Sequence, residues 1–494
     1  MARLSHNLAA NFMGQGVTAL AGVLFLPVYV HLLGIERFAL IGIYASLYAV
    51  MALLDGGLST TLNREMAADS SAAQRRARLR AMECVYVAMA GAMGIGVWLL
   101  SPLLARHWLG VVAVGGEQVA HIFALMGLVL LFQLPVTLYN GGLLGQQRHI
   151  ALNAVNAAFA MLRWGGAALV LWILPPRLET YFLWHAGASC LHAGVLATML
   201  WRGLGGGAWQ GPQLAALRGI LRFSGGVWAV SLLGAVLLQA DKLILGRLLP
   251  LATLGQYMLA AMFALVIARA SSPIFSSFFP RLSALVARGN RAELWEVYHF
   301  GVQAVAVIVL PIAFTVALFA HEILLIWTRD AALAGEAAVI LRLLSLGVGC
   351  SGLLVLPYAL LFAHGGTRLA FFCNLAAVAL LVPGLVIIAD GYGAVGAAAL
   401  WLAVNAALAA SFPLLCHHKL AGSLMLGGWL RDLLPPALAA LLTAGLLRWA
   451  ASGAGPGWQA AAIVACAALS IGAAVLAAAH LRGWLLLRLR GGLA

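Results

Sequence analysis

Two arginines lie inside long apolar stretches of this chain, where a charge is costly. Arg269 sits near the middle of the run from Gln256 to Pro280, and Arg163 interrupts the run around residue 164. A guanidinium at the centre of a hydrocarbon layer costs about 2.5–3.5 kcal/mol, so it normally faces a protein interior or a watery cavity. Arginine also forms forked, charge-assisted bonds with phosphate. The two arginines therefore predict either recognition of an anion such as a diphosphate, or a structural role in which they bind carbonyls of neighbouring helices.

Further polar side chains recur at helical spacing within the apolar stretches. Positions three or four residues apart share one face of a helix, so each stripe of polar residues needs a protein or water to face. Interhelical hydrogen bonds, worth about 0.6 kcal/mol each, would satisfy any single one of them. Taken over six stretches, the stripes predict a hydrated, net basic cavity. Besides the two arginines, the side chains predicted to line it are Asn7, Asn11, Gln15, Tyr44, Tyr48, Asn156, His185, Ser231, Gln239 and Ser272.

A second set of charges lies at the predicted ends of apolar stretches. It comprises Asp55, Arg64, Asp241 and Lys242. The two carboxylates are expected to form gate ion pairs, for instance with the arginine or the lysine, or to cap helices, with proton or cation coupling as the alternative. The neighbouring pair His417 and His418 is expected to be solvated in a loop. The six cysteines show no CxxC spacing, and neither a metal site nor a cofactor is predicted.

Composition defines the class of protein that must position these residues. Of the 494 residues, 64% are hydrophobic and 9% are charged, and the mean hydropathy is +1.00, which excludes a soluble globular protein. Fourteen apolar spans of about 17–25 residues are each long enough to cross a bilayer. Their centres are near residues 22, 48, 92, 129, 164, 191, 234, 266, 310, 347, 379, 404, 442 and 469. The sequence predicts an all-α polytopic membrane protein.

The distribution of basic residues predicts the orientation. The net charge of +14 comes almost wholly from arginine. If the N-terminus is cytoplasmic, nineteen basic residues fall on the cytoplasmic side and eight on the opposite side. Because cytoplasmic loops carry the excess of Lys and Arg, both termini are expected to be cytoplasmic.

An internal repeat relates the first twelve spans. Leu134-Pro135 followed by Arg148 and Asn153 is echoed, about 220 residues later, by Leu356-Pro357 followed by Arg368 and Asn374. An even number of helices per repeat gives both halves the same topology, related by a pseudo-twofold axis along the membrane normal. The expected organisation is an N-lobe of spans 1–6, a C-lobe of spans 7–12 and a C-terminal helix pair, at residues 1–205, 206–420 and 421–494.

The run from Leu26 to Ala67 carries a family pattern. In LPVYVHLLGIERFALIGIYASLYAVMALLDGGLSTTLNREMA, a proline ends the first span, LG-x-E precedes the second, and Asp-x-Gly-Leu runs into Arg-Glu; the residues are Pro27, Leu33-Gly34-Ile35-Glu36, Asp55-Gly56-Gly57-Leu58 and Arg64-Glu65. The pattern resembles the Wzx-like polysaccharide flippases of the multidrug/oligosaccharidyl-lipid/polysaccharide exporter superfamily.

That resemblance implies an alternating-access flippase in the bacterial inner membrane. It would move a polyprenyl-diphosphate-linked oligosaccharide from the cytoplasmic to the periplasmic leaflet, for assembly of O-antigen, capsule or exopolysaccharide. The implied partners are this lipid-linked cargo, membrane lipids, a polysaccharide polymerase and a chain-length regulator, with a monomeric transporter and no nucleic acid. The alternatives are a lipid II flippase and a multidrug/cation antiporter on the same fold. A membrane enzyme is disfavoured, since the sequence has no sizeable extramembrane loop, no closely paired acidic residues and no phosphate-binding loop.

Overall fold

The computed structural model describes residues 21–55, 58–67, 71–105, 116–205, 233, 236–421, 426–453 and 456–483. All regular secondary structure in these residues is helical. Nine helices of the described part are long and apolar enough to cross a membrane, by length and composition. Each predicted span centre lies at a helical position, except residue 234, which is outside the described residues. The predicted all-α polytopic architecture is confirmed.

The chain divides into two compact units, Met1–Gly255 and Gln256–Ala494. This division separates an amino-terminal from a carboxy-terminal half. The three-part organisation at residues 1–205, 206–420 and 421–494 stays a prediction, because the first of its boundaries adjoins residues that the structure does not describe.

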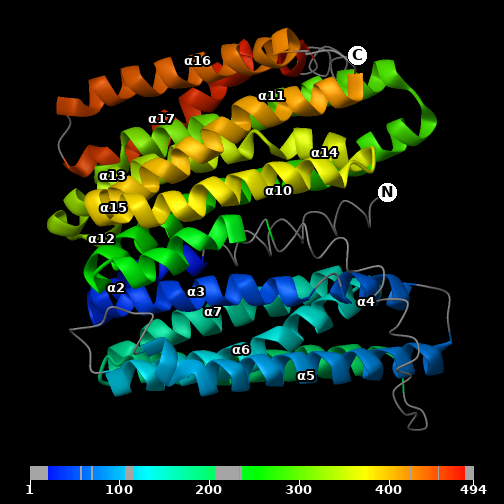
Figure 1. Ribbon diagram of the computed structural model, residues 1–494, viewed down its shortest axis with the longest axis vertical. Helices are drawn as coiled ribbons and strands as arrows, with labels where there is room; N and C mark the ends of the chain where they lie inside the picture. Colours follow the sequence, from blue (N-terminus) through cyan, green and yellow to red (C-terminus); the bar gives the residue numbers. More distant parts are fainter. Residues whose placement is uncertain are drawn as a thin grey trace. The chain divides into compact units, whose positions relative to one another are not determined.

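Unit 1 is built from helices that run back and forth beside one another (Figure 1). They are α2 (Leu26–Leu33), α3 (Ile35–Leu54), α4 (Leu58–Ala67), α5 (Ala72–Leu103), α6 (Gly116–Gly145), α7 (His149–Ile173), α8 (Leu178–Gly203) and a helical stretch at 236–248. Helix α6 is central, because it packs against α4, α5 and α8. Glycines allow this close approach: a Cβ at Gly127 would lie 2.8 Å from the Gly94 carbonyl oxygen, and one at Gly141 would lie 2.3 Å from the Ser59 carbonyl oxygen.

Unit 2 begins within α10 (Leu251–Arg288). Its other helices are α11 (Arg291–Leu318), α12 (Ala320–Thr328), α13 (Ala331–Gly352), α14 (Val355–Ala363), α15 (Thr367–Ala421), α16 (Leu426–Ala450), the short η3 (Ala451–Gly453) and α17 (Pro456–Ala477). Gly393 divides α15 into two helices, since its φ of 56° is not helical. Helices α16 and α17 pack together and against α11 (Figure 1), around a small core that includes Val307, Ala440 and Ala474.

The same turn occurs once in each unit, at matching positions of the chain. Helix α6 ends at Gly145 and α14 ends at Ala363. A shift of 218 residues carries Gln147 onto Gly365, and both residues have a positive φ, of 58° and 71°. The next helices begin at the matching positions 149 and 367. Such a left-handed residue closes a helix and reverses the chain.

The helical hairpin on either side of this turn is bridged in the same way in both units. Asn156 Nδ2 donates to Asn140 Oδ1 at 2.9 Å in unit 1. Tyr358 Oη donates to Asn374 Oδ1 at 2.7 Å in unit 2, and the same shift of 218 residues relates the two pairs of positions. The predicted internal repeat therefore appears as repeated local structure.

Candidate functional site

Five of the predicted site residues lie in one region of unit 1, around Arg163. This residue projects from α7 and is half-buried, and its Nε is buried without a hydrogen-bond partner among the described residues. Its charge acts on Tyr44 of α3 and on Tyr181, His185 and His192 of α8. Helices α3 and α8 thus bring polar side chains towards a guanidinium on α7.

Several of the side chains on which the Arg163 charge acts are aromatic and pack against one another. The rings of Tyr181 and His185 are 4.1 Å apart between centroids, and Tyr44 lies 6.4 Å from His185. Tyr181 and His185 are fully buried, yet the Tyr181 hydroxyl and both His185 ring nitrogens lack a hydrogen-bond partner among the described residues. An unsatisfied buried polar group costs about 1–3 kcal/mol, and such groups normally meet water or a bound species.

Amide side chains extend this polar region along α6 and α8. Gln133 of α6 donates to the Tyr48 hydroxyl at 3.4 Å and accepts from the Ser189 hydroxyl at 2.8 Å. Sequence reasoning missed Gln133 as a site residue, although it interrupts the apolar run FALMGLVLLFQLPV, and that interruption was the available signal.

A second set of polar contacts connects α6, α7 and α8. Asn156, which donates to Asn140, lies with its carbonyl oxygen 3.0 Å from Nε2 of His192. Phe159 stacks on the His192 ring at 4.5 Å. Together these residues form what we call the Arg163 cluster: Tyr44, Tyr48, Gln133, Asn140, Asn156, Arg163, Tyr181, His185, Ser189 and His192. The cluster contains a guanidinium, imidazoles, amides and hydroxyls, and none of its members is a carboxylate.

Of the other predicted cavity residues, two are described but are not part of the Arg163 cluster, and the side chains of the rest are outside the described part of the chain. Arg269 is on α10 in unit 2, where its side chain is exposed. Gln239 is half-buried in the helical stretch 236–248 of unit 1. The structure does not describe Asn7, Asn11, Gln15, Ser231 or the Ser272 side chain. The common cavity lined by both arginines stays a prediction.

The charged residues at the helix ends are arranged only in part as expected. Asp241 and Lys242 form an ion pair, with 3.0 Å between Nζ and Oδ1. Asp55 does not pair with Arg64, which instead lies 3.7 Å from a Glu65 carboxylate oxygen.

Asp55 is held by neutral donors instead. It is buried, and its carboxylate accepts from the Tyr86 hydroxyl, from the Ser59 hydroxyl at 2.8 Å and from the Ser59 backbone N–H at 3.3 Å. The bond to the Ser59 N–H lies at the start of α4, where backbone donors have no partner within the helix. This geometry favours the capping role over an ion pair with Arg64.

A second acidic residue of unit 1, Glu83, also bridges helices, and no pattern in the sequence singled it out as a site residue. Glu83 of α5 accepts from the Tyr139 hydroxyl of α6 at 3.1 Å and from the Trp201 indole N–H of α8 at 2.9 Å. The Arg80 guanidinium lies over the Trp201 ring, 5.2 Å from its centroid. The carboxylate therefore joins three helices near the arginine-rich start of α5.

Asp432 plays the corresponding role in unit 2. Its buried carboxylate binds Nδ1 of His299 and accepts from Gln303 Nε2 at 2.9 Å, both of α11, and His480 Nε2 lies 3.8 Å away. Gln303 Oε1 in turn accepts from the backbone N–H of His480 at 2.9 Å. These contacts join α16, and the segment after α17, to α11.

The prediction that His417 is solvated is wrong. Helix α15 continues through this residue, so its side chain turns into the protein, where it is fully buried. Its Nε2 lies 2.9 Å from the Tyr298 hydroxyl of α11. In the part of the chain that the structure describes, no three His, Cys, Asp or Glu residues are grouped so as to hold a metal ion.

The comparison with protein families is decisive for classification. Residues 4–286 match the family described as polysaccharide biosynthesis protein. This chain belongs to that family. No curated protein matches this polysaccharide biosynthesis family member.

Solved structures similar to this family member share its fold at low sequence identity. The lipid II flippase MurJ, in an inward closed conformation, is 10% identical with a TM-score of 0.74, covering 95% of this chain and 98% of that one. An inward-facing multidrug resistance MATE family transporter of the MOP superfamily is 13% identical with a TM-score of 0.67, covering 83% and 98%. A MOP superfamily transporter from Pyrococcus furiosus is 15% identical with a TM-score of 0.54, covering 85% and 95%. The resemblance seen in the sequence is confirmed.

Proposed function

We propose that this protein is a flippase that moves a polyprenyl-diphosphate-linked oligosaccharide across the bacterial inner membrane, from the cytoplasmic to the periplasmic leaflet. Membership of the polysaccharide biosynthesis family supports a cargo that belongs to polysaccharide assembly. The shared fold with MurJ and MATE transporters supports a transport mechanism over an enzymatic one.

The observation that carries the choice of cargo is the composition of the Arg163 cluster. Its one permanent charge is a guanidinium, and no carboxylate is among its members. A fixed positive charge repels a cationic drug, whereas a diphosphate accepts forked bonds from arginine. Sugar hydroxyls both donate and accept hydrogen bonds, as do the amides, hydroxyls and imidazoles of the cluster. The MOP transporter from Pyrococcus furiosus is described as having a binding pocket of reverse polarity, so cargo of different charge is compatible with this fold.

Substitution of Arg163 tests the proposal. The full-length protein is reconstituted in liposomes that contain a fluorescent polyprenyl-diphosphate oligosaccharide, and transfer between leaflets is measured. Arg163→Ala removes charge-assisted bonds worth about 1.5–3 kcal/mol, so transport should fall roughly tenfold or more. Arg163→Lys should be intermediate, since it keeps the charge and loses the fork. Arg202→Ala is the matched control, because Arg202 is exposed at the end of α8 and outside the cluster.

The unfolding temperature of each variant is measured together with its transport rate, so that a loss of transport can be distinguished from a loss of folding. A stably folded Arg163→Ala protein that transports at the wild-type rate removes the cluster from cargo recognition. Faster transport of a hydrophobic cation than of the lipid-linked oligosaccharide by the wild type would refute the proposal itself.

A lipid II flippase is the second candidate. The MurJ structure covers 95% of this chain with a TM-score of 0.74, and lipid II also carries a diphosphate between a polyprenyl chain and sugars. The same vesicles decide between them when lipid II replaces the oligosaccharide cargo. Preferred transport of the peptide-free oligosaccharide supports our proposal, and preferred transport of lipid II supports the alternative.

A further inference from the structure

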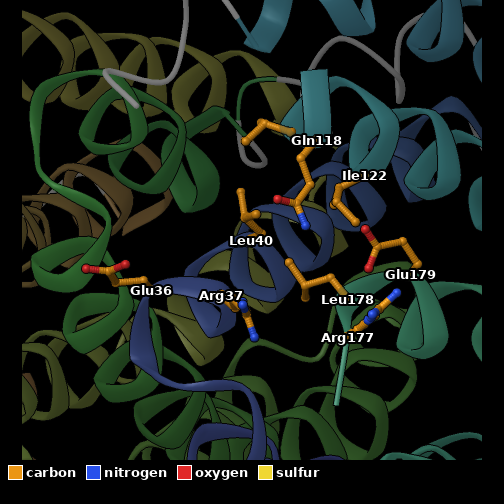
Figure 2. Close-up of a pocket in the computed structure, with 9 residues that line it drawn as sticks. Glu36, Arg37, Leu40, Gln118, Ile122, Arg177, Leu178 and Glu179 are labelled. Carbon is orange, nitrogen blue, oxygen red and sulfur yellow. The ribbon is translucent and has the colours of Figure 1, made fainter. Parts of the chain in front are cut away.

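A pocket of about 250 Å³ opens in unit 1 where the first two turns of α3, α6 and α8 meet (Figure 2). It is separate from the Arg163 cluster, with which it shares no residue. Its floor is apolar and buried, and its rim is polar. The floor consists of Leu40, Val119, Ile122 and Leu178, and the rim of Glu36, Arg37, Gln118, Arg177 and Glu179.

The topology explains why these helix ends lie together. Helices α6 and α8 begin at one face of unit 1, because the single helix between them, α7, runs in the opposite sense, and the pocket places the start of α3 at the same face. That face is opposite the arginine-rich start of α5, which is antiparallel to α6. The first backbone N–H groups of each helix lack partners within the helix and carry partial positive charge. Arg177, the residue before α8, makes no side-chain bond to cap them.

The rim carries two arginines and two glutamates, and one of the glutamates, Glu36, does not face the other charged groups. Figure 2 shows Glu36 turned away from the other polar side chains, while Gln118, Arg177 and Glu179 lie on one side of the pocket and Arg37 on another. Among the described residues, no ion pair involves Arg37, Arg177 or Glu179. The arginines are exposed and Glu179 is half-buried. The rim is therefore free to bind a ligand that carries both a negative and a positive group.

We propose that this pocket binds the headgroup of a zwitterionic phospholipid that carries a primary amine, as in phosphatidylethanolamine. The phosphate binds between Arg37 and Arg177, for which forked guanidinium bonds are suited. The ammonium group binds the Glu179 carboxylate, and the Gln118 amide contacts the headgroup. A phospholipid headgroup lies at the level of helix ends, just outside the hydrocarbon core. A trimethylated amine cannot donate hydrogen bonds to Glu179, and a glycerol headgroup has no positive charge to offer it.

Native mass spectrometry of the full-length protein with defined lipids tests this assignment. The wild type should retain phosphatidylethanolamine over phosphatidylcholine and phosphatidylglycerol. The double variant Arg37→Ala/Arg177→Ala should lose at least tenfold in retention of phosphatidylethanolamine. Glu179→Gln should keep phospholipid binding and lose the preference over phosphatidylglycerol. Arg247→Ala is the control, since Arg247 is an exposed arginine of unit 1 that does not line the pocket.

Three results would overturn the proposal. They are equal retention of the three lipids by the wild type, unchanged retention by the double variant, and an unchanged lipid preference in Glu179→Gln. Thermal unfolding of each variant in detergent confirms that it is folded; because the substituted side chains are on the rim, no large change is expected. Displacement of the bound lipid by free oligosaccharide, without discrimination among lipid headgroups, would assign the pocket to cargo and likewise overturn the proposal.

Discussion

Removal of the Asp432 carboxylate should loosen the packing of α16 against α11. Asp432 is 4% exposed, and it is the shared acceptor for His299 and Gln303. Replacement by alanine leaves the buried Gln303 amide and the half-buried His299 ring without their partner, and removing one partner of a buried pair costs about 3–5 kcal/mol. Replacement by asparagine keeps one oxygen acceptor and loses the charge, so the free energy of unfolding should fall by about 1.5–3 kcal/mol.

Unfolding of the purified protein by heat or by denaturing detergent measures this loss. Asp390→Asn is the matched control, because Asp390 is an exposed aspartate of the same unit. A cycle with His299→Ala isolates the pairwise contribution, which should be about 0.5–3 kcal/mol for residues in direct contact. If Asp432→Asn and Asp390→Asn proteins unfold alike, and the cycle shows no coupling, the carboxylate does not hold these helices together and the reasoning fails.

Three further predictions concern packing, cargo recognition and capping. Gly141→Ala should destabilise unit 1 by about 1–3 kcal/mol, because its Cβ would lie 2.3 Å from the Ser59 carbonyl oxygen; Gly91→Ala, which meets nothing within 4 Å, should have little effect on the unfolding temperature. Arg269→Lys should leave partial transport and Arg269→Ala should abolish it at normal membrane abundance; normal transport by the alanine variant would remove this residue from the mechanism. Asp55→Asn should lower the unfolding temperature and leave the pH dependence of transport unchanged, since a cap does not carry protons; a shifted pH profile would restore the coupling role.

The membrane class, the positions of the spans and the internal repeat follow from the sequence itself. An apolar segment of sufficient length is a local property, because the hydrocarbon core selects for helices that satisfy their own backbone hydrogen bonds. The turn at Gln147 and its counterpart at Gly365 is also local, and its flanking residues are similar enough in the two halves to reveal the repeat. The polar stripes placed Tyr44, Arg163 and His185 among the candidate site residues, and in the structure the Arg163 charge acts on both Tyr44 and His185. The common cavity that these residues were expected to line stays a prediction.

Only the tertiary structure decided which side chains are partners. Asp55 binds Tyr86 and not the charged residue nearby in sequence, and Asp432 meets His299 across 133 positions of the chain. Such pairings depend on how each helix is rotated about its axis. In a chain this apolar, most faces of a helix are acceptable to lipid or to a neighbouring helix, so periodicity defines the rotation weakly and side-chain packing fixes it. The pocket at the ends of α3, α6 and α8 has the same origin, since its rim residues come from three separate spans that only folding brings together.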